Sequence, residues 1–134
     1  MKEYAEYFKA LGDETRLRIL YLLIRADSEL CVCELTDTIE IPQYNISKHL
    51  KILKNAGLVV ERKEGRWVNF RLKNDNDIFT QSILKAISGI PHSLLSKDMK
   101  ELGKRLNIRV EGKCLLGIQK GHLKNNHVHL KQFK

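Results

Sequence analysis

Residues 42–57 read PQYNISKHLKILKNAG, and this stretch decides the fold. Pro42 has a fixed φ and no N–H to donate, so it suits the first turn of a helix. The pattern that follows predicts a helix from Gln43 to Asn55, because apolar residues recur at i, i+4 and i+7, namely Ile46, Leu50 and Leu53. Gly57 stands just past the helix end, where a left-handed conformation is needed. The polar face of this helix is left to contact a partner.

The period of the apolar pattern changes from 3.6 to 2 directly after this helix. Leu58–Lys63 and Arg66–Leu72 alternate in the manner of two strands, and Glu64-Gly65 forms a two-residue turn between them. We therefore expect a β-hairpin here.

Three helices are expected before residue 42. The first covers residues 3–11, and the second begins after the break at Gly12 with Asp13 as its N-cap. Residues 30–33 (LCVC) look extended, and a third, short helix follows from about Glu34 to Ile39. Two short helices joined by a tight break and followed by a hairpin are typical of a winged helix-turn-helix. The predicted fold class is therefore mainly α with a small β-hairpin.

In such a fold the second helix enters the major groove, and the wing lies along the backbone or the minor groove. Amides and ammonium groups on the helix can pair with base edges, while hydroxyls, further lysines and the basic hairpin tip can reach phosphates. The candidate DNA-binding residues are Gln43, Tyr44, Asn45, Ser47, Lys48, Lys51, Lys63 and Arg66. The alternative is a solvated amphipathic helix beside an ordinary hairpin. His49 lies next to an apolar position and is expected to be a structural group.

The distribution of charge favours DNA as the partner. The 134 residues carry a net charge of +8, but residues 43–73 hold eight Lys and Arg against two acidic residues, whereas residues 1–42 hold five against nine. A clustered excess creates a field that an anionic polymer feels. Residues 97–134, with ten basic and three acidic residues, form a second basic region whose role the pattern leaves open.

The chain beyond the hairpin divides at about residue 92. Polar residues 74–77 offer caps for a fifth helix, whose apolar stripe (Phe79, Ile83, Ile87 and Ile90) needs a partner. We assign residues 1–92 to a winged helix-turn-helix DNA-binding domain, and residues 93–134 to a basic C-terminal extension, partly helical, whose last twenty or so residues are expected to be poorly ordered. No apolar run approaches the ~20 residues of a membrane helix and no secretory signal opens the chain, so a cytoplasmic protein is expected.

Four segments carry a resemblance to a known family: ELCVCEL (29–35), NISKHLKIL (45–53), AGLV (56–59) and GRWV (65–68). They resemble the ArsR/SmtB family of metalloregulatory repressors, in the family's order and over about residues 5–90. The resemblance implies a homodimeric winged helix joined through the first and last core helices, so the stripe on the fifth helix finds its partner there. It also implies that an inducer ion releases double-stranded operator DNA.

Cysteine spacing suggests where that ion binds. Cys31 and Cys33 share a face in an extended segment but point about 200° apart on a helix, so both sulfurs hold one ion only where the segment is not helical. Thiolates are soft ligands, which favours arsenite or antimonite as inducer, with cadmium, lead or copper(I) as alternatives. Arsenic sensors of the family commonly have a third cysteine where this chain has Thr36, and Cys114 is the remaining candidate for a three-sulfur site. Alternatively, the first two cysteines are small core residues and Cys114 is a stray thiol.

Other functions remain to be weighed. The zinc-sensing branch carries an Asp/His ligand set on its fifth helix, and residues 75–90 contain no histidine, so no zinc site is expected there. The tail histidines, which can bind a borderline metal or simply be solvated, are His122, His127 and His129. No permanent cofactor and no enzyme are expected, since phosphate-loop, zinc-protease and nucleophile motifs are lacking. A repressor that senses thiol oxidation and a metal-buffering or delivery protein stay open as alternatives.

Overall fold

The computed structural model describes residues 1–73 and 75–124. Its elements are α1 (Lys2–Leu11), α2 (Glu14–Ala26), β1 (Leu30–Cys31), α3 (Val32–Ile39), α4 (Gln43–Asn55), β2 (Val59–Glu64), β3 (Trp67–Leu72), α5 (Ile78–Ser88), the 3₁₀ helix η1 (His92–Leu95), α6 (Ser96–Asn107) and the 3₁₀ helix η2 (Gly121–Leu123). This confirms the predicted mainly α winged helix-turn-helix. Asn74, His127 and His129, which entered the sequence predictions, lie outside the described residues.

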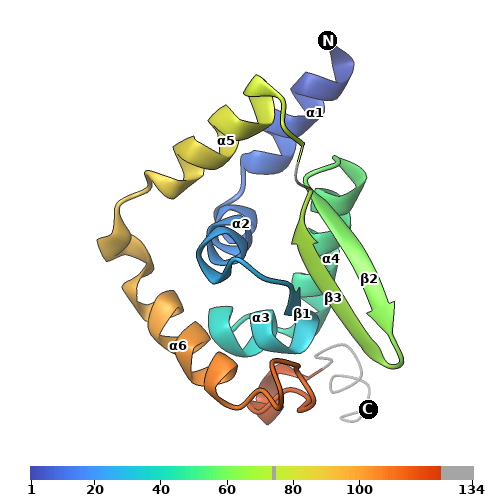
Figure 1. The fold of residues 1–134 in the computed structure, drawn as a ribbon, viewed down its shortest axis with the longest axis vertical. Coiled ribbons are helices and arrows are strands. Elements are labelled where there is room, and N and C mark those ends of the chain that lie inside the picture. The colour runs from blue at the N-terminus through green and yellow to red at the C-terminus, as the bar shows by residue number, and fades with distance from the viewer. Residues whose placement is uncertain (74, 125–134) are drawn as a thin grey trace, which may run out of the picture.

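The sheet has three antiparallel strands in the order β1-β3-β2, so the short β1 extends the hairpin on its inner side (Figure 1). Pairing of Glu64 with Trp67 places the turn at Gly65 and Arg66. The predicted turn, Glu64-Gly65, was wrong by one residue. Gly65 has a φ of 60°, so the residue without a side chain still takes the left-handed position.

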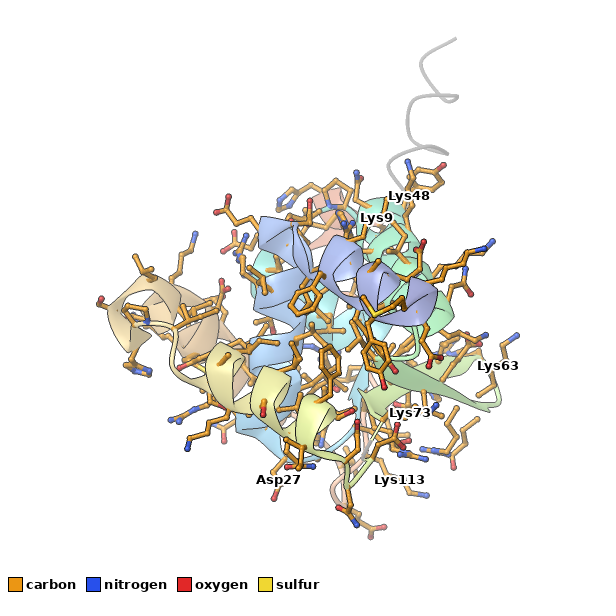
Figure 2. The ribbon with its side chains drawn as sticks, turned by 90° about the horizontal axis from the view of Figure 1, so that it is seen from above. Lys9, Asp27, Lys48, Lys63, Lys73 and Lys113 are labelled. Carbon is orange, nitrogen blue, oxygen red and sulfur yellow. The ribbon has the colours of Figure 1, made fainter. Side chains whose placement is uncertain are left out.

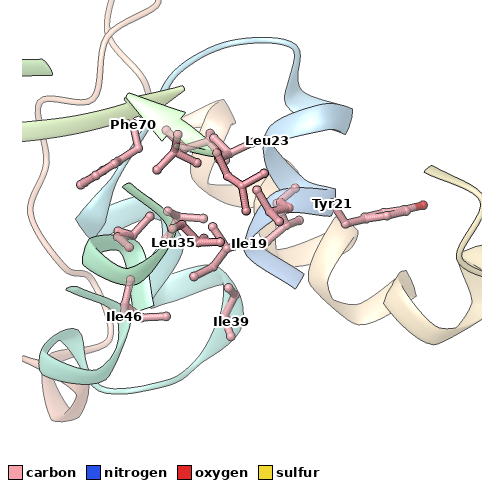
Figure 3. Packing of buried hydrophobic residues seen from close by; sticks show 14 of the residues in the cluster. Ile19, Tyr21, Leu23, Leu35, Ile39, Ile46 and Phe70 are labelled. Atoms are coloured by element: carbon pink, nitrogen blue, oxygen red, sulfur yellow. The ribbon is translucent and has the colours of Figure 1, made fainter. Parts of the chain in front are cut away.

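The core forms around α2, which is surrounded by the other elements (Figure 1). Apolar side chains from four elements converge on it, as the close-up of the packing shows (Figure 3). They include Ile19 and Leu23 of α2, Leu35 and Ile39 of α3, Ile46 of α4 and Phe70 of β3. The buried face of α4 is the one predicted, and Asp13 caps α2 by accepting a hydrogen bond from the Arg16 N–H at 3.0 Å. Packing of α3 and α4 on one core fixes the geometry of the helix-turn-helix.

Helices α1 and α5 lie side by side at one end of the molecule (Figure 1). Aromatic rings join them, because Phe79 of α5 contacts Tyr4, Tyr7 and Phe8 of α1 with ring centroids 4.8 to 5.7 Å apart. Phe8 nevertheless remains 58% exposed, and Ile78 86%. This pair of helices therefore leaves apolar surface uncovered within the single chain.

The C-terminal extension runs back along the domain instead of leaving it. Helix α6 lies along α3 (Figure 1), and an ion pair of 2.8 Å joins Asp98 to Arg18 of α2. Beyond α6, Ile118 and Leu123 are buried. Both residues lie in the C-terminal stretch that the sequence led us to expect to be poorly ordered. None of the helices in the described ranges is long and apolar enough to cross a membrane.

Candidate thiol site and DNA-binding surface

The start of α3 holds the first two cysteines in two different conformations. Cys31 is the N-cap, with an extended backbone (φ −87°, ψ 162°), whereas Cys33 already lies in the first turn. The expectation that residues 30–33 are all extended was therefore wrong, because the helix begins at Val32. A capping box explains the early start, since the Glu34 N–H donates to Cys31 Sγ at 3.4 Å and the Cys31 N–H donates to Glu34 Oε1 at 3.0 Å.

Cys114 comes to this helix start from the far end of the chain. Its Sγ lies 2.7 Å from Sγ of Cys31, close enough for both to contact one ion. Among the described residues, the one group of three potential ligands with mutual distances within 4.8 Å is Cys31, Glu34 and Cys114. Cys33 is outside that group and interacts with Cys31. The structure thus brings Cys114 to the predicted place and adds a carboxylate that the sequence did not suggest.

A buried ion pair holds the segment that carries Cys114. The Arg109 guanidinium donates to both oxygens of Glu34, at 2.7 and 2.8 Å, and to the Glu29 carbonyl oxygen at 2.7 Å. The Glu34 carboxylate is fully buried. Since a guanidinium and a carboxylate pair best in this forked geometry, Arg109 fixes the chain five residues before the thiol.

A second carboxylate of α3, Asp37, holds the chain beyond the thiol. It accepts hydrogen bonds from the N–H groups of Gln119 and Lys120, and Nε of Arg105 lies 3.2 Å from it. Arg105 also donates to Sγ of Cys114 at 3.4 Å. The sequence prediction missed both ion pairs. Their signal was present as two acidic residues three apart on α3 and two basic residues four apart near the end of α6.

The surroundings shift the pKa of each thiol differently. The hydrogen bond with Cys114 lowers the pKa of Cys31, but the hydrogen bond with Cys33, burial and the Glu34 carboxylate together raise it to about 12. The hydrogen bond with Cys31, followed by burial, raises the pKa of Cys114, and the hydrogen bond with Cys31 lowers the pKa of Cys33. Cys33 therefore ionises first, while the other two thiols keep their protons at neutral pH.

The predicted DNA-binding side chains lie on α4 and on the hairpin. All are exposed except Gln43, which is partly buried at the start of α4. Lys48 projects from α4 and Lys63 from the hairpin (Figure 2), and the Arg66 guanidinium lies 4.7 Å from the centre of the Trp67 ring. His49 is partly buried with its Nδ1 3.1 Å from Arg16, which fits the structural role expected of it.

A groove of about 410 Å³ connects this surface to the thiols. One wall is the outer face of α4 and the other is the hairpin. The lining includes Cys31 and Cys33 together with Ser47, Lys51, Lys63 and Arg66. On the other side of the sheet, Cys114 lines a separate pocket with Glu29, Arg62 and Arg109.

The fold and this surface define a winged helix-turn-helix DNA-binding regulator. Residues 13–60 match the family model described as bacterial regulatory protein, arsR family. The chain is 41% identical over 101 residues to the arsenic resistance transcriptional regulator ArsR1 of Pseudomonas putida, an alignment that covers 73% of this chain and 78% of the relative. It is 48% identical over 67 residues to the arsenical resistance operon repressor of Escherichia coli, covering 50% and 56%. The chain belongs to the ArsR family of transcriptional regulators and is not an enzyme.

Solved structures agree with this assignment. HlyU from Vibrio cholerae matches with a TM-score of 0.56 and 32% identity, covering 71% of this chain and 94% of that one. The homodimeric winged helix-turn-helix domain of Mb0332 from Mycobacterium bovis matches with a TM-score of 0.55 and 29% identity, covering 68% and 84%.

Proposed function

We propose that this regulator is a homodimeric repressor that leaves its operator when a soft metalloid ion, with arsenite or antimonite favoured over cadmium and lead, binds Cys31, Cys33 and Cys114. The meeting of Cys31 and Cys114 at the start of α3 carries the proposal. Relatives named as arsenical and cadmium resistance regulators support an inducer of this kind.

The donor set suits such an ion. Soft ions prefer sulfur ligands, whereas magnesium and calcium prefer oxygen ligands, so this set of thiols favours a soft ion. An ion held by all three sulfurs supplies the bonds that draw Cys33 toward Cys114. The Cys31 thiol and the Glu34 carboxylate already cap α3 in the free protein, so the helix start is ordered in the state that binds DNA.

Release of DNA follows from the position of Cys33 within the first turn of α3. Cys33 interacts with Cys31 but lies outside the close group formed by Cys31, Glu34 and Cys114, so we expect the first turn to shift when one ion joins all three sulfurs. Helix α3 packs against α4, so a change at its start alters how α4 is held. Thermodynamic linkage then requires DNA to weaken ion binding by the same factor as the ion weakens DNA binding.

On the DNA side, α4 enters the major groove and the hairpin contacts the backbone or minor groove. Lys48 is exposed near the middle of α4, which makes it a candidate for a base edge. Replacing Lys48 by alanine should weaken specific binding, and an unchanged operator affinity would remove it from the contact set. The uncovered apolar surface of α1 and α5 supports dimerisation there, as does the homodimeric relative.

A titrated footprint on the DNA upstream of its own gene tests the proposal. The native chain should protect a site and release it as arsenite is added, under a reductant that keeps the thiols free. The variants Cys31→Ser, Cys33→Ser and Cys114→Ser should bind the site but need much more arsenite for release. If Cys114→Ser keeps full induction, the three-sulfur site is wrong, and if no variant or native chain leaves a footprint, a metal-buffering protein becomes the better explanation.

Thiol oxidation is a second candidate, favoured by the closeness of Cys31 and Cys114. A hydroperoxide would take two electrons and two protons from this pair, leaving a disulfide, water and an alcohol. Release by peroxide without arsenite, reversed by a thiol reductant, would support this mechanism over ion binding.

A further inference from the structure

We propose that Arg109 sets the ion selectivity of the thiol site by occupying the Glu34 carboxylate and thereby withholding an oxygen ligand. The inference rests on the proposed function, since it concerns the same site. It assigns a specificity-determining role to a residue of the C-terminal extension that binds the Glu34 carboxylate.

The Glu34 carboxylate lies close enough to the thiols to serve as a further ligand of a bound ion. Its carboxylate lies within 4.8 Å of the sulfurs of both Cys31 and Cys114, and it is fully buried. In the free protein both of its oxygens are occupied, because Oε2 accepts from Arg109 Nε and Oε1 accepts from Arg109 Nη2 and the Cys31 N–H. The guanidinium therefore competes directly with any ion for this carboxylate.

The charges around the thiols balance without an ion. The carboxylates of Glu34 and Asp37 face the guanidinium groups of Arg109 and Arg105, two against two. When an ion replaces the thiol protons, the three thiolates carry the remaining charge, and a trivalent metalloid neutralises them fully. A divalent ion on the same sulfurs leaves a net negative charge in a partly buried place, which is costly when no partner compensates for it.

Coordination preferences also favour a trivalent metalloid over a divalent ion at this site. Arsenic(III) and antimony(III) carry a lone pair and are satisfied by three sulfurs. Zinc is almost always four-coordinate in such sites and accepts carboxylate oxygen beside sulfur. Cadmium, a larger ion of the same charge and group, follows the same preference. A Glu34 carboxylate released from Arg109 would thus raise the affinity for divalent ions and leave the affinity for arsenite unchanged.

The test compares arsenite and cadmium binding to the native chain and to Arg109→Gln. Contacts between a ligand and the residue behind it are worth about 10-fold to 100-fold in metal affinity. We expect the ratio of cadmium to arsenite affinity to rise by at least about 10-fold in Arg109→Gln. Sulfur-to-cadmium charge-transfer absorbance and competition with a chelator read the affinity without any DNA.

Three variants control the comparison. Arg109→Lys keeps a cation on Glu34 and should preserve most of the native selectivity. Arg109→Gln combined with Glu34→Gln removes the new ligand and should lose the gain for cadmium. Lys97→Gln removes another cation that pairs with a glutamate, Glu40, at an exposed position away from the Cys114 pocket, and should leave the ratio unchanged.

The melting temperature gives a second measure of ion binding by the variant. If Arg109→Gln folds poorly alone, the rise in its melting temperature on adding cadmium should exceed that of the native chain, since an ion that binds only the folded state stabilises it. An unchanged ratio together with an equal melting shift would overturn the inference while arsenite binding by the native chain still stands. Failure of the native chain to bind arsenite would overturn the proposed function and this inference together.

Discussion

At the scale of single residues, the protonation of the thiols decides how the site responds to different ions. Burial and the contacts among Cys31, Cys33 and Cys114 leave two of the three protonated at neutral pH. A cadmium ion must displace these protons, so its binding releases them to solvent. Arsenite carries hydroxide groups that combine with the thiol protons to form water, so its binding releases almost none.

Cadmium affinity should therefore depend on pH much more steeply than arsenite affinity. Because the pKa of Cys31 is raised to about 12, raising the pH from 6 to 8 favours loss of its proton and hence favours cadmium. Each displaced proton contributes up to about a 10-fold gain in affinity per pH unit. Titrations of both ions at several pH values measure the slopes, and equal slopes would contradict the assignment of protonated thiols.

At the scale of elements, α3 is held at two buried carboxylates, Glu34 and Asp37, by the chain that follows α6. Glu34 binds Arg109 before Cys114, and Asp37 binds backbone N–H groups after it. The segment that carries the Cys114 thiol is thus anchored on α3, and the thiol contacts the start of that same helix. This coupling makes the C-terminal extension part of the site.

The Asp37→Asn variant should destabilise the fold and loosen this segment. The side chain of Arg105 is only 5% exposed and would lose its ion-pair partner, and breaking one member of a buried pair costs about 3 kcal/mol or more of unfolding free energy. Urea unfolding measures the loss. The control is Glu64→Gln, whose partner Arg62 is exposed, with an expected change within about 0.5 kcal/mol. A loss in Asp37→Asn no greater than that of the control would refute the anchoring role.

The sequence predicted correctly those elements that are determined by the spacing of apolar residues and by capping residues nearby in the chain. The helix Gln43–Asn55, its buried face and the cap at Asp13 follow from apolar spacing and from capping chemistry, and all are confirmed. The start of α3 was misplaced because a cysteine served as N-cap, which is not among the usual capping residues. The hairpin turn was shifted by one residue because either dipeptide containing Gly65 fits a two-residue turn.

The carboxylate and guanidinium groups of the site could not be predicted in the same way. Glu34 and Arg109 are separated by 75 positions in the chain, and no periodic pattern reports such a contact. The role of Cys114 was inferred only because a sulfur was missing from the family pattern. Long-range pairing of this kind depends on how α6 packs on α3, which is a property of the tertiary structure.

At the scale of the whole molecule, the groove between α4 and the hairpin places the thiol of Cys33 beneath the proposed DNA-binding surface. Its walls carry Lys51, Lys63 and Arg66, whose charges attract phosphate groups. We expect a duplex docked on α4 and the hairpin to cover this groove. Cys114 opens instead into the pocket on the other side of the sheet.

Operator DNA should therefore slow the alkylation of Cys33 and leave that of Cys114 nearly unchanged. The lowered pKa of Cys33 makes it the more reactive thiol in the free protein, so an uncharged maleimide labels it readily. At duplex concentrations about 100 times the Kd, only about one protein molecule in a hundred is free, which limits the labelling rate accordingly. Mass spectrometry of peptides after timed quenching reads each cysteine separately, so Cys114 serves as the internal control in the same sample.

A Cys33 alkylation rate that stays constant on saturated operator would show that the groove remains open to solvent. Equal slowing of both thiols would instead indicate a general tightening of the fold, and either result would remove the steric part of the competition between DNA and ion.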